Sequence, residues 1–373
     1  MKKSFEEVFI DKTRYGTKIK TDEYCKSGKH IIVDQSQNAI AGFTDLDSGL
    51  FTDVPAIIFG DHTRVIKYVD EPFFLGADGT KILRSNICNA NYKYLYYALK
   101  NARIPNTGYN RHFKWLKEIE IQYPDEKTQN NIASLLDKVL YVINLRKDEL
   151  QKLDDLIRAR FVEMFGDPVE NPRGYYVATL QDLIEKGFIT YHLDGNHGGD
   201  YPRSEEFVES GIPYISANCI VHGEIDFAKA KYLTPERAGK LRKGIAQNED
   251  VLFAHNATVG PTVVLHTDEE KVILGTSLTA YRCNQEEILP NYLKAYMLSN
   301  GFVRQYSSEM KQTTRNQVPI TAQKKYQFLI PPIEEQKQFT VFVNQIDKSK
   351  ATVQKALDET QLLFDSLMQQ YFG

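Results

Sequence analysis

Two polar segments carry the side chains of this sequence that could bond to the edges of DNA bases. The first is Asn106-Thr107-Gly108-Tyr109-Asn110-Arg111-His112-Phe113-Lys114, and the second is Lys311-Gln312-Thr313-Thr314-Arg315-Asn316-Gln317. Arginine can bond both acceptors of guanine, and asparagine or glutamine can bond adenine in the same bidentate way. Lysine, threonine and backbone amides can hold phosphates. Either segment taken alone is better explained as a solvated turn.

Shorter polar clusters extend this hypothesis into other parts of the chain. They add amides, a histidine and a threonine that could reach a base, and lysines and an arginine that could hold a phosphate or simply form a solvated helix face. The candidate DNA-binding residues are Gln35, Gln37, Asn38, Tyr109, Asn110, Arg111, His112, Lys114, Asn218, Lys240, Arg242, Lys243, His255, Asn256, Thr258, Lys311, Gln312, Thr313, Thr314, Arg315, Asn316 and Gln317.

Catalytic and metal-binding patterns are missing from the sequence. It has no GxxxxGK[ST] phosphate loop, no GxGxxG turn, no HExxH, and no Asn/Asp-Pro-Pro-aromatic motif of an amino-methyltransferase. The four cysteines lie too far apart in the sequence for a zinc ribbon or a CxxC redox pair. We therefore predict no catalytic residue, no bound metal and no directly bound cofactor.

Charge and hydropathy limit where the chain works and how it could hold DNA. Its net charge is −3, so any DNA binding must come from local patches. The N-terminus lacks the apolar core of a signal peptide, and no apolar run is long enough to span a membrane. We expect a cytoplasmic protein with reduced cysteines and no membrane partner.

The chain contains an internal repeat that locates both polar loops. The segments 124–166 and 331–373 align without a gap, because Pro331 and Gly373 lie 207 residues after Pro124 and Gly166. Each candidate loop lies shortly before one of these segments. This matched placement raises a shared role for the two loops to equal standing with two incidental turns.

Both repeated segments have the apolar spacing of a long amphipathic helix. Apolar residues recur at alternating steps of four and three, and no Pro or Gly interrupts the periodic stretch. They are Ile132, Leu136, Val139, Ile143, Leu150, Leu153, Ile157 and Met164 in the first segment, and Phe339, Val343, Ile346, Val353, Leu357, Phe364, Leu367 and Tyr371 in the second. Four positions of these stripes are polar, namely Arg146, Arg160, Lys350 and Thr360. Roughly 38 residues at about 1.5 Å each give a helix of about 57 Å. The apolar stripe must be buried, against the chain's own globular parts or, most simply, against the other copy.

The remaining sequence predicts two globular parts of mixed strand and helix. Strand-like runs at 56–59, 65–69, 251–254 and 262–265 alternate with Gly- and Asn-rich turns. We predict domains at 1–123 and 167–330, each followed by a helix, at 124–166 and 331–373. The fold class is therefore α+β, with two mixed α/β domains and two long helices.

At this point the sequence resembles the specificity subunits of type I restriction–modification enzymes. Pro331-Pro332-Ile333-Glu334-Glu335-Gln336 matches the opening of their spacer helices well, and Pro124-Asp125-Glu126-Lys127-Thr128-Gln129 matches it less closely. The segment from Phe161 to Pro168 resembles the junction after the first helix. The segment from Leu252 to Gly260 resembles part of a recognition domain. The likeness spans nearly the whole chain, although the first domain departs most from the pattern.

This resemblance implies two target-recognition domains that each read one half of a split DNA site. It implies that the two helices pair as an antiparallel coiled coil with pseudo-two-fold symmetry, and that this coil acts as a spacer. Partner methyltransferase subunits would supply S-adenosylmethionine chemistry, and restriction subunits would supply ATP- and Mg-dependent translocation and cleavage. Double-stranded DNA and these two kinds of subunit are the expected partners.

Three other interpretations of the sequence stay open. The chain could be a fused methyltransferase or nuclease, which would need a cofactor loop that we do not find. It could be a coiled-coil adaptor whose globular parts bind proteins. It could also be the specificity subunit of another restriction class.

Overall fold

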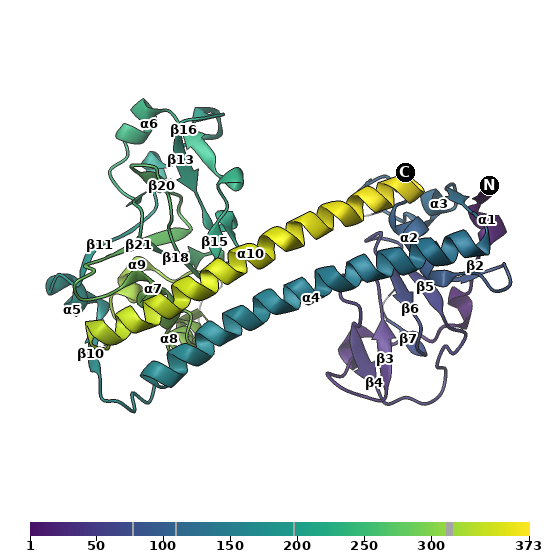
Figure 1. Ribbon diagram of the computed structural model, residues 1–373, viewed down its shortest axis with the longest axis horizontal. Coiled ribbons are helices and arrows are strands. Elements are labelled where there is room, and N and C mark those ends of the chain that lie inside the picture. The colour runs from purple at the N-terminus through teal and green to yellow at the C-terminus, as the bar shows by residue number, and fades with distance from the viewer. Residues whose placement is uncertain (77, 109, 197, 311–315) are drawn as a thin grey trace. The chain divides into compact units, whose positions relative to one another are not determined.

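The fold is described from a computed structural model, which covers residues 1–76, 78–108, 110–196, 198–310 and 316–373 (Figure 1). The chain divides into two compact units. The first unit consists of Met1–Lys147 and Lys355–Gly373, and the second unit is Asp148–Gln354. Each unit therefore contains one globular part together with one end of each long helix.

The first unit is built on two small sheets. A four-stranded antiparallel sheet has the order β2 (Phe9–Asp11), β8 (Thr80–Ser85), β5 (Ala56–Gly60) and β6 (Ile66–Val69). A three-stranded sheet has the order β4 (Gly42–Thr44), β3 (His30–Val33) and β7 (Phe73–Leu75), with β3 and β7 parallel. The remaining elements are the pair β1 (Lys2–Ser4) and β9 (Glu120–Gln122) and the helices α1 (Phe5–Val8), α2 (Tyr92–Lys100) and α3 (Phe113–Leu116).

The second unit repeats this plan with additions. Its four-stranded antiparallel sheet has the order β11 (Ile189–Asp194), β21 (Leu278–Cys283), β18 (Val251–Asn256) and β19 (Thr258–Val264). Its five-stranded sheet has the order β12 (Phe207–Val208), β16 (Lys231–Leu233), β13 (Ile212–Ile215), β20 (Val272–Leu274) and β17 (Ile245–Ala246), with β13 and β20 parallel. The remaining elements are the pairs β10 (Tyr176–Thr179) with β22 (Gln327–Ile330) and β14 (Ile220–Val221) with β15 (Glu224–Ile225), and the helices α5 (Leu180–Glu185), α6 (Pro235–Gly239), α7 (Pro290–Met297), α8 (Asn300–Met310) and α9 (Ile320–Gln323).

The central strands of both four-stranded sheets are apolar, and this places them in the cores. Every residue of β5 is buried, and in β18 only Asn256 is partly exposed. Strands buried on both faces read as continuous apolar runs, in contrast to the alternating pattern of half-exposed strands. The short apolar runs in the sequence therefore identified the middles of the two sheets.

Two long helices, α4 (Glu126–Phe165) and α10 (Ile333–Phe372), run through both units. All sixteen apolar residues that the repeat placed on the helical stripes are buried or partly buried. In the second unit Phe161 and Phe165 near the end of α4 pack on Phe339 near the start of α10. The two helices are therefore antiparallel in this unit. No helix in the described part of the chain is long and apolar enough to cross a membrane.

An ion pair joins the two helices closer to their middles in the second unit. The Lys350 ammonium lies 2.7 Å from the Asp154 carboxylate, and the Lys350 side chain is only 15% exposed. Lys350 occupies a stripe position that the apolar repeat leaves polar. A polar residue at such a position fixes register between paired helices, because any shifted pairing would bury the charge without its partner.

The contacts at the helix ends are matched in the two units. Phe165 at the end of α4 packs on Tyr292 in the second unit with ring centroids 5.0 Å apart. Phe372 at the end of α10 packs on Tyr94 in the first unit at 5.3 Å. The two tyrosine hydroxyls donate to equivalent carbonyls, Tyr292 to Leu329 at 2.6 Å and Tyr94 to Gln122 at 2.7 Å.

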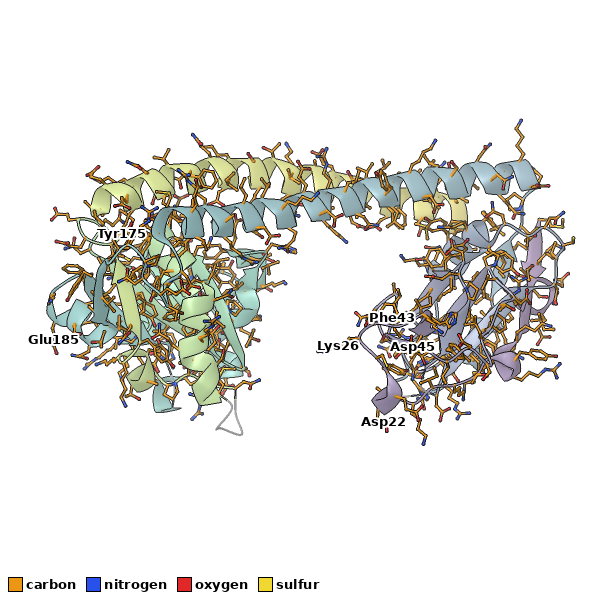
Figure 2. The ribbon with its side chains drawn as sticks, turned by 90° about the horizontal axis from the view of Figure 1, so that it is seen from below. Asp22, Lys26, Phe43, Asp45, Tyr175 and Glu185 are labelled. Atoms are coloured by element: carbon orange, nitrogen blue, oxygen red, sulfur yellow. The ribbon has the colours of Figure 1, made fainter. Side chains whose placement is uncertain are left out.

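The helix starts are matched as well. Gln129 Nε2 donates to the Pro124 carbonyl at 2.8 Å, and Gln336 Nε2 donates to the Pro331 carbonyl at 2.9 Å. In the second unit Tyr175 also holds the two helices, because its hydroxyl donates to Glu335 at 2.6 Å while its ring faces Phe165 (Figure 2). The predicted α+β class with two long antiparallel helices is confirmed. The division into four segments remains a prediction, because the compact units divide within the helices.

Candidate nucleic-acid interface

In the second unit the structure brings together predicted residues from two distant segments. Strands β18 and β19 form a tight hairpin whose turn residue, Ala257, has a φ of 63°. The Ala257 amide donates to the Asn316 carbonyl at 2.9 Å, and the Val318 amide donates to the His255 carbonyl at 2.8 Å. Asn256 and Gln317 form the bridge between these two contacts. The hairpin and the segment after residue 315 thus form one surface.

This surface presents polar groups that can recognise base edges. Thr258, Asn316 and Gln317 are exposed, and Asn256 is partly exposed. We refer to these four residues as the second-unit polar surface. Three amide side chains and a hydroxyl, held on a tight turn and on the segment bonded to it, can offer donors and acceptors to a groove.

His255 lies beneath this surface and is not on it. It is 3% exposed, and its Nδ1 lies 2.8 Å from the Thr279 hydroxyl. Burial lowers the pKa of His255, so the ring is neutral near pH 7. As placed, the imidazole cannot reach a base, and its visible role is to hold the hairpin.

The first unit has an equivalent arrangement built from different residues. The turn between β5 and β6 is tied to the segment before α3, because the Asp61 carbonyl accepts from the His112 amide at 2.8 Å. His112 Nδ1 lies 2.9 Å from the same carbonyl, and the Asp61 carboxylate accepts from the Phe113 amide at 2.8 Å. His112 is fully buried, so it too supports the turn from inside.

Gln35 supports the same turn from the other side. Its Nε2 donates to the Asp78 carbonyl at 2.8 Å, and its Oε1 accepts from the His62 amide at 3.2 Å. The neighbouring Gln37 and Asn38 are exposed. Of this predicted cluster, Gln35 is therefore engaged in the protein, while the other two side chains face solvent.

The predicted loop before α3 is only partly free to bind. Asn110 Nδ2 donates to the Thr107 carbonyl at 2.6 Å and so stabilises its own turn. Arg111 is exposed and close enough to Asp78 to lower the pKa of that carboxyl, whose main partner is Lys18. The exposed Lys114 has its ammonium 4.2 Å from the Trp115 ring centroid.

The basic candidates of the second unit lie on other elements. Lys240 pairs with Glu236 one helical turn earlier at 2.8 Å, as expected for a solvated helix face. Arg242 and Lys243 follow α6 and are exposed, and Asn218 is exposed in a turn before β14. The contacts of the hairpin described above do not involve these four residues.

Several predicted residues lie outside the described part of the chain. They are Tyr109, Lys311, Gln312, Thr313, Thr314 and Arg315.

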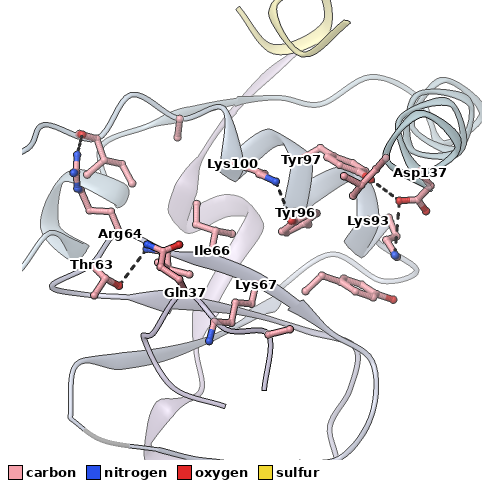
Figure 3. Close-up of a pocket in the computed structure, with 16 residues that line it drawn as sticks. Gln37, Thr63, Arg64, Ile66, Lys67, Lys93, Tyr96, Tyr97, Lys100 and Asp137 are labelled. Carbon is pink, nitrogen blue, oxygen red and sulfur yellow. Dashed lines mark hydrogen bonds and ion pairs between the residues drawn. The ribbon is translucent and has the colours of Figure 1, made fainter. Parts of the chain in front are cut away.

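A cavity in the first unit is lined by basic side chains that are not among the predicted DNA-binding residues. It has a volume of about 710 Å³ and lies between α2 and β6 (Figure 3). Lys93, Tyr96 and Lys100 of α2 line one side, with Arg64 and the predicted Gln37 nearby. The sequence could have indicated these residues, because lysines and tyrosines recur at helical spacing within residues 93–100.

One carboxylate offsets part of this positive charge. Asp137 of α4 lies 3.7 Å from the Lys93 ammonium and accepts from the Tyr97 hydroxyl at 2.6 Å. Lys93 also lies over the Tyr68 ring at 4.3 Å. Within the described residues no group of three or more His, Cys, Asp and Glu side chains is placed to hold a metal ion.

Each unit has a four-stranded sheet of the same strand order, a hairpin turn tied to a distant segment, and the end of a long helix packed on it, so the fold is a duplicated α+β fold with two long helices. The chain belongs to the type I restriction modification DNA specificity domain family, whose model matches residues 2–155 and 172–360. That family is defined by DNA specificity and is the non-catalytic part of these systems.

Individual relatives agree with this assignment. A type I restriction enzyme specificity subunit of Methanocaldococcus jannaschii is 24% identical over 208 residues, covering 54% of this chain and 46% of that protein. The match therefore spans about half of the relative's length. A specificity subunit from M. genitalium has a TM-score of 0.59 at 18% identity, covering 100% of this chain and 96% of that one.

A second solved structure comes from work on assembly and conformational transition of a type I restriction–modification system. It has a TM-score of 0.50 at 16% identity and covers 100% of this chain and 97% of its own. At these identities both structures show a shared fold and nothing finer.

Proposed function

We propose that this chain is the specificity subunit of a type I restriction–modification enzyme and reads a bipartite DNA target. The family assignment supports DNA specificity. The internal duplication of the chain is the observation that supports a bipartite target. Each unit has a four-stranded sheet of the same strand order and a turn tied to a distant segment. Two equivalent readers on one chain suit two half-sites on one duplex.

The long helices would set the gap between the half-sites. Paired antiparallel helices resist bending more than a flexible linker does, so they can convert a length of protein into a length of DNA at about 3.4 Å per base pair. The Lys350–Asp154 ion pair and the aromatic contacts at the helix ends support a fixed register.

The outer faces of the helices would receive the methyltransferase subunits. Large apolar side chains stay exposed there although the inner stripes are buried, for example Tyr141 and Leu362 in the first unit and Val162 and Val341 in the second. Exposed apolar side chains on a helix surface suit a protein partner. We propose that S-adenosylmethionine, ATP and Mg act on the methyltransferase and restriction subunits, and that the assembly works in the cytoplasm.

Selection from a random duplex library tests this function. The chain is purified with its methyltransferase subunit, and bound fragments are sequenced. We expect two short conserved motifs at one fixed separation. A single contiguous motif, or no enrichment, would exclude a bipartite reader.

Side-chain removal then assigns a half-site to the second-unit polar surface. Asn316→Ala or Gln317→Ala is expected to weaken binding by about 1–3 kcal/mol if its amide contacts a base, and to relax one half-site only. The same outcome is predicted for Arg315→Ala. The other half-site serves as the internal control, and equal relaxation of both would remove these residues from the reader.

A further inference from the structure

A buried hydrogen-bond network lies directly under the second-unit polar surface. Gln323 of α9 is its centre and is fully buried. Gln323 Oε1 accepts from the Tyr281 hydroxyl at 2.6 Å and lies 3.1 Å from His192 Nε2. These two partners belong to β21 and β11, so the oxygen side of the amide is fixed to the sheet.

The nitrogen side of the same amide is turned toward the surface. Gln323 Nε2 donates to the Thr279 hydroxyl at 3.2 Å and to the Val318 carbonyl at 3.2 Å. Thr279 in turn meets His255 Nδ1 at 2.8 Å. The Val318 amide donates to the His255 carbonyl at 2.8 Å, which closes the network on the base of the hairpin.

We infer that Gln323 is a positioning residue for DNA reading, because it locks the β18–β19 hairpin and the segment 316–318 into one rigid surface. This inference rests on the proposed function. Gln323 touches no solvent and so contacts no base. It acts through the backbone of Val318 and, by way of Thr279, through His255.

The first unit supports a positioning role by reaching the same result with other residues. There His112 and Asp61 tie the turn after β5 to the segment before α3. A buried amide or imidazole is unfavourable unless it is hydrogen-bonded. The Gln323 amide under one turn and the His112 imidazole under the other therefore each favour the one arrangement of the turn that keeps these hydrogen bonds. An apolar side chain would fill the space but would leave the turn free to shift.

A second buried glutamine provides a matched control. Gln336 is also fully buried in the second unit, and it bonds to the Glu287 carbonyl at 3.0 Å, the Pro331 carbonyl at 2.9 Å and the Leu289 amide at 2.9 Å. It anchors the start of α10 and none of these bonds reaches the hairpin. Gln323→Met and Gln336→Met therefore remove comparable buried networks from different places.

The test compares these two variants in the full chain bound to its methyltransferase subunit. We expect both variants to lower the melting temperature, and only Gln323→Met to change base preference. The expected change is a loss of roughly tenfold or more in discrimination between bases at the half-site read by the second unit. Discrimination at the half-site read by the first unit should be unaltered. Equal base preference in the two variants, or a change in both, would overturn the inference.

Amide hydrogen exchange gives a readout that does not depend on DNA. The Ala257 and Val318 amides should exchange at least about tenfold faster in Gln323→Met than in Gln336→Met. Unchanged protection of both amides would also overturn the inference. If the wild-type complex selects no bipartite target, the proposed function fails, whereas selection by the wild type with no difference between the variants refutes Gln323 alone.

Discussion

The buried His192 makes stability depend on pH in a definite direction. Its side chain is 8% exposed, and burial lowers its pKa to about 4 even though the hydrogen bond to Gln323 opposes the shift. In the unfolded chain a histidine titrates near pH 6.5. The unfolded state therefore binds more protons between these values, so the contribution of His192 to stability is present above pH 6.5 and is lost as pH falls toward 4.

The first prediction follows from this difference in proton binding. Between pH 7.5 and pH 5 the wild type should lose about 2 kcal/mol more unfolding free energy than His192→Gln, which has no ionisable ring. Urea unfolding of both proteins at the two pH values measures this. Equal pH dependence in the two proteins would show that His192 does not carry the effect.

The second prediction concerns the ion pair between Asp250 and Arg282. Asp250 is 1% exposed, and its two carboxylate oxygens accept from Arg282 Nε and Nη2, each at 2.8 Å. Asp250→Asn should cost about 3 kcal/mol, because it leaves a partly buried guanidinium without its counter-charge. Denaturant unfolding checks this, and adding Arg282→Met should recover part of the loss. No loss in the single variant would contradict it.

At the residue scale the sequence predicted the composition of the candidate site better than the orientation of its side chains. Asn316, Gln317 and Thr258 are exposed as expected of contact residues, but His112 and His255 are buried in the same polar segments. Local composition does not reveal which polar side chain faces inward, because hydrogen bonds to residues far away in sequence decide it. Gln323 was missed for the same reason, since its partners come from three separate segments.

At the element scale, the third prediction uses the two matched helix ends. Phe165 is fully buried against Tyr292 and Phe339, whereas Phe372 on Tyr94 is only partly buried. Phe165→Ala should cost about 3–5 kcal/mol, and Phe372→Ala about half as much, because less apolar area is lost. Urea unfolding ranks the two variants, and the reverse order would contradict buried apolar area as the cause of the difference.

The elements with a long repeated pattern were the ones that the sequence predicted well. The helical stripes could be read because a 3.5-residue period continues over many turns and recurs 207 residues later. The strands at 56–59 and 251–254 were found from their apolar runs. The order of the sheets and the parallel pairs β3–β7 and β13–β20 were not predicted, because pairing between distant strands leaves no local signal.

At the scale of the whole molecule, the fourth prediction concerns the spacer. Seven residues inserted between Lys147 and Asp148 of α4, and seven between Gln354 and Lys355 of α10, preserve the apolar stripes because they add two helical turns. The target gap should then grow by about 3 base pairs, since seven residues span about 10.5 Å. Library selection with the double insertion measures the new gap.

Insertion in one helix alone is the control. It shifts the two helical stripes of the first unit relative to each other and moves Phe372 away from Tyr94, so binding to the bipartite target should be lost. A double insertion that leaves the gap unchanged would contradict a spacer role for the helices.

The packing of the end of α10 on the first unit also has a consequence for folding during synthesis. Tyr94 belongs to the part of the chain that leaves the ribosome first, yet its ring is covered by Phe372, which is translated almost 280 residues later. The apolar surface of the first unit around Tyr94 therefore stays exposed to water while the rest of the polypeptide is synthesised. A nascent chain halted shortly before Phe372 would display that face to chaperones and proteases.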